Sequence, residues 1–187
     1  MRHFLLIIFL TCFPILTPGQ VEQKSQEGKG KKNSENPYED LRNRAFSVKA
    51  TDLSLNLPIN QTIVYGVIID WSSGKNLATI VTFTTGDASV YLRSGQIYIG
   101  GFAHTTISEP SKKIVKIAQS LLGQTQITIG HDYPNPNCVK FYFLTSNGIY
   151  VHQDTYQKIK EQNDKWTEVF SLGNVIIAEY RKLTEKK

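Results

Sequence analysis

Cys138 and His131 are the residues of this sequence whose types could support covalent chemistry. They stand seven positions apart, with Asp132 beside the histidine, and a cysteine enzyme needs a thiol activated by an imidazole base. Such pairs usually meet through the fold, however, and the two prolines between these residues predict a loop. A lone cysteine flanked by apolar residues is typical of strand packing. We therefore favour a buried Cys138 and keep a hydrolase-like enzyme using Cys138 and His131 as an alternative.

Other catalytic and metal-binding patterns are missing from the sequence. His104, His131 and His152 are far apart and form no HxH or HExxH spacing, and the chain has no CxxC pair. A serine hydrolase would need a nucleophile elbow of the form GxSxG, which is not found. The sequence therefore predicts no cofactor and no metal, and favours a domain that acts by binding.

Two short stretches are candidates for ligand binding. Gly100, Gly101 and His104 lie in a glycine-rich connection between an expected strand and an expected helix, whose N-terminus could hold an anion. Tight strand-to-helix packing explains the same glycines. Asp70 and Trp71 are expected where the first strand ends, and a carboxylate at that position is a candidate functional group. No second acid pairs with Asp70 in the sequence. The partner could be a protein or a small ligand.

Composition and charge are those of a globular protein. The chain has 187 residues, of which 40% are hydrophobic and 20% charged, and its formal net charge is +5. The basic residues are not interleaved with aromatic residues, so we expect no nucleic acid to bind. Lys112, Lys113 and Lys116 fall on the polar face of an expected helix. The basic residues from Arg181 onward are typical of a frayed terminus.

The N-terminal segment predicts export. Residues 1–19 have the basic start, apolar centre and small-residue exit of a secretory signal peptide, with cleavage after Gly19. The alternative is a lipoprotein signal acylated at Cys12, but Thr11 precedes this cysteine where a smaller residue is usual. Residues 20–40 are polar and predict a disordered tether, and residues 41–187 a single domain. We expect a periplasmic or extracellular protein without a transmembrane segment after cleavage, or a lipid-anchored envelope protein.

The stretch from Thr62 to Gly101 predicts an antiparallel meander. It contains runs of β-branched and aromatic residues separated by short Gly, Ser, Asn and Asp clusters. The run Ile63–Ile69 is almost continuously apolar, which indicates a central strand covered on both faces. A second hairpin is expected around Asn147 and Gly148, a sequence that favours a tight turn.

One amphipathic helix is expected between the two hairpins. It should begin near Ser108 and Pro110 and end at Gly123. Its apolar stripe has helical spacing and contains Ile114, Val115, Ile117, Ala118, Leu121 and Leu122. Towards the C-terminus, a helical turn over residues 166–172 is expected to stop at Gly173, and residues 174–180 to form the last strand.

These elements predict an α+β domain. A single antiparallel sheet of about five or six strands would carry one main amphipathic helix and short flanking helices. Their order is similar to that of the profilin-like and roadblock-like folds.

The run Val64–Gly95, VYGVIIDWSSGKNLATIVTFTTGDASVYLRSG, resembles a group of uncharacterised bacterial proteins, along about 100 residues from Leu41 onward. This chain departs from the group's pattern at residues 96–101, and the resemblance implies no activity. The leading interpretation is an exported, non-catalytic domain that binds a protein or a small ligand.

Overall fold

The computed structural model of this chain describes residues 37–185. The expected signal peptide, Cys12 and residues 20–36 of the expected tether lie outside the described residues. Helix α1 begins at Pro37, as the pair Asn36-Pro37 predicts for a helix start, although this lies inside the range of 20–40 that was given to the tether. Ordered structure therefore starts before residue 41, because the side chain of Tyr38 is only 1% exposed and belongs to the core.

Seven strands form one antiparallel sheet in the order β4-β3-β2-β1-β6-β7-β5. The strands are β1 (Val64–Ser73), β2 (Asn76–Phe83), β3 (Ala88–Leu92), β4 (Ile97–Tyr98), β5 (Gln126–Thr128), β6 (Cys138–Thr145) and β7 (Gly148–Thr155). The helices are α1 (Pro37–Ser47), α2 (Thr105–Leu121), α3 (Tyr156–Glu161) and α4 (Lys165–Glu185), with short 3₁₀ helices η1 (Ala50–Leu53), η2 (Gly101–Ala103) and η3 (Leu122–Gln124). Among residues 37–185, none of these helices has the length and apolar character needed to cross a membrane.

The single antiparallel sheet of an α+β domain confirms the predicted class, but the predicted strand number was too low. The sheet has seven strands where five or six were expected. Two of the seven, β4 and β5, have only two and three residues and lie at the two edges. So short a strand carries too few alternating positions to give a clear sequence pattern.

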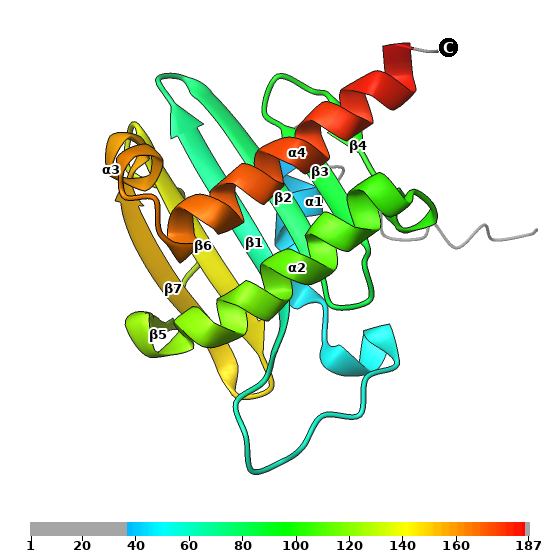
Figure 1. Cartoon of the computed structure of the whole chain (residues 1–187), viewed down its shortest axis with the longest axis vertical. Helices are drawn as coiled ribbons and strands as arrows, with labels where there is room; N and C mark the ends of the chain where they lie inside the picture. The colour runs from blue at the N-terminus through cyan, green and yellow to red at the C-terminus, as the bar shows by residue number, and fades with distance from the viewer. Residues whose placement is uncertain (1–36, 186–187) are drawn as a thin grey trace, which may run out of the picture. The chain divides into compact units, whose positions relative to one another are not determined.

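Helices cover both faces of the sheet, as Figure 1 shows: α2 and α4 lie side by side on one face, and α1 lies behind the other. The larger core packs between the sheet and α2, α3 and α4. A second core on the opposite face joins the sheet to α1 and to apolar residues of the segment that follows it. Strand β1 is accordingly buried from Val64 to Asp70, as its continuous apolar run indicates.

Helix α4 is the main departure from the sequence interpretation. Residues 174–180 were expected to form a strand after a stop at Gly173, but they continue one 21-residue helix. A Cβ atom at position 173 would lie 3.0 Å from Cδ1 of Ile80 and 3.3 Å from Cδ1 of Ile69. Gly173 therefore lets α4 lie close to the sheet and does not end the helix. Its buried residues have helical spacing and are Trp166, Val169, Phe170, Gly173, Ile176, Ile177 and Tyr180.

Helix α2 is present as predicted, although it begins at Thr105 and contains Pro110. Its apolar stripe is only partly buried. Ile114 and Leu121 are buried, whereas Ile117 and Leu122 are half-buried at the edge of the larger core. Ile117 was expected at the middle of the buried stripe and instead reaches the surface.

We predict that an aspartate on α2 will lower stability much more at a buried position than at a surface position. Ile114→Asp puts an unpaired carboxylate at a site with 0% exposure and should remove most of the roughly 5–15 kcal/mol that stabilises such a domain. Ile117→Asp should cost only about 1 kcal/mol, because its carboxylate can reach water. Thermal melts of both variants and the parent chain test this. Equal loss of stability in the two variants would contradict the packing described for α2.

Candidate functional site

Asp70 lies in a buried ion pair and not at an open strand end. Its Oδ2 atom accepts hydrogen bonds from Nε and Nη2 of Arg42 at 2.9 and 2.6 Å, and its Oδ1 atom accepts one from Thr79 Oγ1 at 2.5 Å. Asp70 has 0% exposure and Arg42 3%. Burial raises the pKa of the Asp70 carboxyl, and the hydrogen bonds from Arg42 and Thr79 act in the opposite direction.

Arg42 extends this pair into a network that closes one face of the sheet. Its Nη2 atom also donates to the backbone oxygen of His131 at 2.6 Å. Its guanidinium carbon lies 4.8 Å from the ring centroid of Phe46 and 4.5 Å from that of Tyr133. The network joins α1, β1 and the loop between β5 and β6, which leaves Asp70 no access to a ligand in this structure.

Trp71 points to the opposite face of the sheet from Asp70. Its ring stacks on Tyr156 of α3, with centroids 5.3 Å apart, and meets Phe170 of α4 edge to face at 5.4 Å. The side chain is half-buried, and its indole Nε1 is buried without a hydrogen-bond partner among the described residues. Asp70 and Trp71 are therefore neighbours in the sequence that take part in different layers of the fold.

The predicted glycine-rich site contains one residue that is buried in the packing, Gly101, and one that lies at the surface, His104. Gly101 is buried, and a Cβ atom there would lie 2.5 Å from Tyr180 Oη and 2.5 Å from Ile107 Cγ2. Gly100 has a φ of 84°, in the left-handed region that favours glycine. His104 is exposed and precedes α2 without a capping hydrogen bond from its side chain. No contact given by the structure brings these residues to Asp70 or Trp71.

No contact given by the structure joins the side chains of Cys138 and His131. Cys138 is a buried free cysteine at the start of β6. The His131 ring stacks on Phe46 of α1, with centroids 4.6 Å apart. The backbone oxygen of the adjacent Asp132 accepts a hydrogen bond from Tyr142 Oη at 2.5 Å, and Tyr142 lies about 13 Å along β6 from Cys138 at the usual strand rise.

Other titratable side chains form small local groups. The imidazole of His152 stacks on Trp166 with centroids 4.0 Å apart, and its buried Nε2 atom has no hydrogen-bond partner among the described residues. Burial lowers the pKa of His152, so the neutral imidazole is favoured there. Within residues 37–185, no three His, Cys, Asp or Glu side chains gather closely enough to hold a metal ion.

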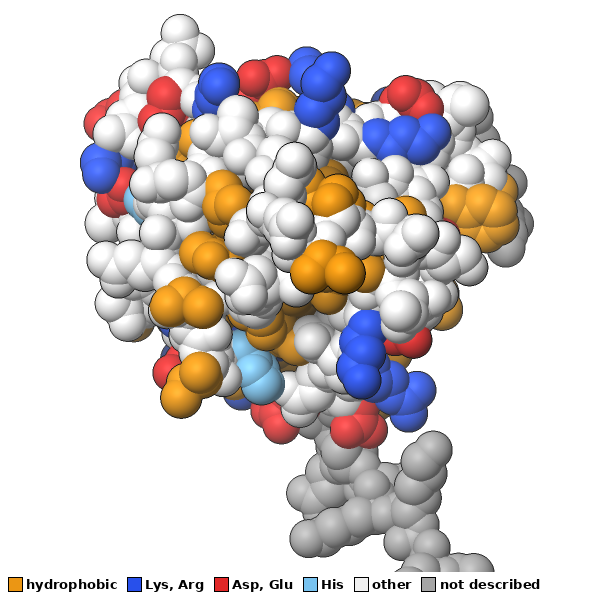
Figure 2. All heavy atoms as spheres, turned by 90° about the horizontal axis from the view of Figure 1, so that it is seen from below, with side chains coloured by type: hydrophobic (Ala, Val, Ile, Leu, Met, Phe, Trp, Pro, Cys, Tyr) orange, Lys and Arg blue, Asp and Glu red, His pale blue; other side chains and the backbone are white. Residues whose placement is uncertain are grey.

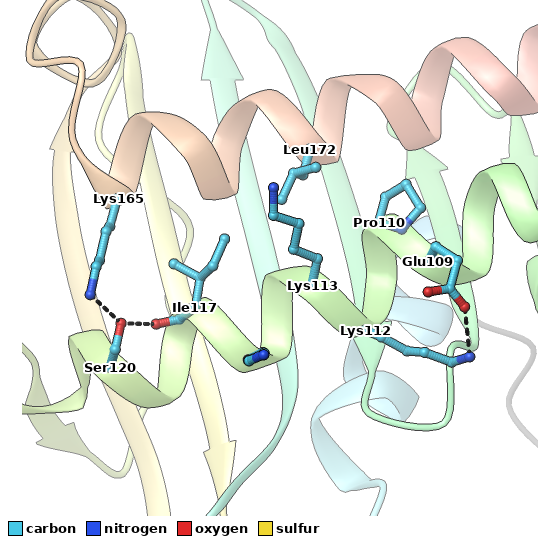
Figure 3. A pocket seen from close by; sticks show the side chains of 9 residues that line it. Glu109, Pro110, Lys112, Lys113, Ile117, Ser120, Lys165 and Leu172 are labelled. Carbon is cyan, nitrogen blue, oxygen red and sulfur yellow. Dashed lines mark hydrogen bonds and ion pairs between the residues drawn. The ribbon is translucent and has the colours of Figure 1, made fainter.

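An open groove with a volume of about 800 Å³ lies between α2 and α4. Figure 3 shows that Lys113 and Ile117 reach from α2 towards α4, where Leu172 faces them. Four of the nine lining residues are lysines and one is an acid. The lining residues are Glu109, Pro110, Lys112, Lys113, Lys116, Ile117, Ser120, Lys165 and Leu172.

The lysines surround an apolar floor made by Ile117 and Leu172. Lys113 pairs with Glu168 at 2.8 Å, and Lys165 donates to Ser120 Oγ at 2.9 Å. Lys112 pairs with Glu109 at 2.9 Å, and the partners in both ion pairs are about half exposed, so water and salt screen their attraction. Lys116 has no ion-pair partner among the described residues. We name this combination of an apolar floor and a basic rim the basic groove.

Three lysines of the basic groove were recognised in the sequence, but the sequence did not show that they line a groove. Lys112, Lys113 and Lys116 were assigned to the polar face of a helix, where solvent exposure explains them. The fourth, Lys165, and the floor residue Leu172 come from α4, which the sequence interpretation divided into a helical turn and a strand. Only the packing of α4 beside α2 brings the two sets together.

Comparison of the chain with models of known families, with curated proteins and with solved structures found no match. The resemblance of Val64–Gly95 to uncharacterised bacterial proteins, and the similarity to profilin-like and roadblock-like folds, therefore stay predictions from the sequence. The functional argument rests on the geometry of this chain.

We predict that the Arg42–Asp70 pair is strongly coupled. Asp70→Leu or Arg42→Leu alone leaves one buried charge without its partner, and each should cost about 3–5 kcal/mol of stability. The double variant Arg42→Leu/Asp70→Leu should cost less than the sum of the two, because no unpaired charge remains. Urea unfolding of the four proteins measures the coupling. Additive losses would show that the pair does not hold α1 to the sheet.

Proposed function

We propose that this chain is an exported binding module and that its basic groove receives an acidic, amphipathic helix of another protein. The observation that carries the proposal is the apolar floor of Ile117 and Leu172 within a rim of four lysines. A partner helix with apolar residues along one stripe and acids beside that stripe matches this surface in both polarity and charge.

The secondary structure of the groove favours a helical partner over an extended one. Its two walls are helices, whose internal backbone groups are already hydrogen-bonded, so they offer an extended peptide no ladder to join. The two sheet edges do offer free backbone groups, but β4 and β5 have only two and three residues. Strand addition at either edge would therefore gain few hydrogen bonds.

Other surfaces of the molecule support this choice of groove. No aromatic residue lines the basic groove, so it lacks the stacking platforms with which proteins bind single-stranded nucleic acid. Figure 2, which views the molecule from below, shows hydrophobic side chains in small separate clusters with most of the charged side chains around the border. That face shows no continuous apolar patch bordered by lysines.

We predict that a synthetic peptide will bind the groove through both charge and apolar contact. A fluorescein-labelled helical peptide of about 18 residues, with leucines along one stripe and glutamates beside it, would match α2 in length, about 26 Å. Its fluorescence anisotropy should rise saturably with added chain. Lys112→Glu/Lys116→Glu should weaken binding at least about tenfold. The control Lys75→Glu/Lys160→Glu makes the same charge change outside the groove and should bind normally.

Three outcomes would overturn the proposal. Equal binding by the groove variant and the parent chain, or equal loss in the groove variant and the control, would show that the groove does not select the peptide. Vesicles of an anionic phospholipid provide a second arm. If the parent chain binds these vesicles through Lys112 and Lys116 and does not bind the peptide, the groove faces a membrane surface and the helix proposal is wrong.

A further inference from the structure

A second hollow lies on the same face of the sheet, near the C-terminal half of α4. Its volume is about 280 Å³. Three of its residues form a row across adjacent strands, because Trp71 of β1 pairs with Ala78 of β2, and Ala78 pairs with Leu92 of β3. Arg181 of α4 completes the hollow from the helical layer.

The small side chain of Ala78 is what leaves room in this row. Its neighbours on either side are the large side chains of Trp71 and Leu92, and its methyl group fills little of the space between them. Polar residues from two turns border the space: Ser73 and Asn76 at the turn between β1 and β2, and Ser94 at the turn between β3 and β4. The hollow therefore combines an apolar floor with a polar border.

The charge at this hollow is positive and unbalanced. Of the residues that line the hollow, Arg181 carries a charge and none carries a carboxylate. The Arg181 guanidinium has no ion-pair partner among the described residues, and guanidinium groups bind carboxylates with two parallel hydrogen bonds. The exposed Arg181 guanidinium donates hydrogen bonds, so the site suits an acceptor.

We propose that this hollow, bounded by Trp71, Ala78, Leu92 and Arg181, is a binding site for a small organic carboxylate with a flat apolar body. The apolar body lies over Ala78 against the Trp71 ring, and the carboxylate pairs with Arg181. The volume is slightly below the roughly 300 Å³ at the lower end of ligand sites, so the ligand is small. This site is separate from the basic groove, with which it shares no lining residue.

Trp71 can report on its own site. The chain has two tryptophans, and Trp166→Phe leaves Trp71 as the single indole fluorophore. Titration of this variant with benzoate should change the Trp71 emission saturably. Benzyl alcohol has a similar shape without the charge and should bind at least tenfold more weakly. These two probes separate recognition of the carboxylate from simple apolar contact.

Two substitutions in the Trp166→Phe background test the two parts of the site. Arg181→Gln changes an exposed side chain, so folding should be unaffected and benzoate should bind at least tenfold more weakly. Ala78→Leu fills the hollow and should abolish the emission change. Arg44→Gln, at an exposed position on α1 at the opposite face, is the matched control and should leave the titration unchanged.

The proposal is overturned if benzoate does not change Trp71 emission, or if it binds Arg181→Gln as tightly as the parent variant. Equal affinity for benzoate and benzyl alcohol would also contradict it, because the site would then not select a carboxylate. If Ala78→Leu fails to fold, Arg181→Gln alone decides the outcome. The basic groove contributes no residue to these measurements, so failure here leaves the helix-binding proposal intact.

Discussion

The buried charge of Asp70 is the constraint on which this structure depends. It lies on the central strand β1, where a carboxylate without its partner would cost about 3–5 kcal/mol, a large part of the roughly 5–15 kcal/mol that stabilises such a domain. Arg42 provides the partner, and its position on α1 requires that helix to pack against the sheet. The same guanidinium holds the backbone at His131. One ion pair therefore joins the segments that cover this face, and it leaves the Asp70 carboxylate no access to a ligand in this structure.

The two surfaces that we propose for binding lie on the opposite face. Gly173 allows α4 to approach the sheet closely, and α2 packs beside it, so the outer sides of these two helices form the basic groove. The smaller hollow lies near the C-terminal half of α4. The row Trp71, Ala78 and Leu92 forms its floor, and Arg181 borders it. One packing arrangement thus creates two distinct hollows lined by basic residues, for which we propose a helix and a small carboxylate as ligands.

Local patterns predicted much of the fold and little of the site. The continuous apolar run of β1 and the stripe of α2 identified the central strand and the main helix, because both patterns lie within one element. Helix α4 was missed because Gly173 resembles a helix stop, although it serves close packing against Ile69 and Ile80. Trp71 was recognised as a candidate, but its setting depends on strand register and on a residue of α4. Contacts between distant segments, such as Arg42 with Asp70, have no local signature.

The central claim is that binding occurs on the face covered by α2 and α4. The opposite face, which holds the Arg42–Asp70 pair, serves stability. Amide chemical shifts of the isotopically labelled chain, followed during titration with the acidic helical peptide, test it most directly. We predict that the shifted amides cluster in α2 and α4 around Ile117 and Leu172, and that those around Asp70 do not move. Shifts centred on α1 and Tyr133, with α2 and α4 unchanged, would contradict this assignment of the two faces.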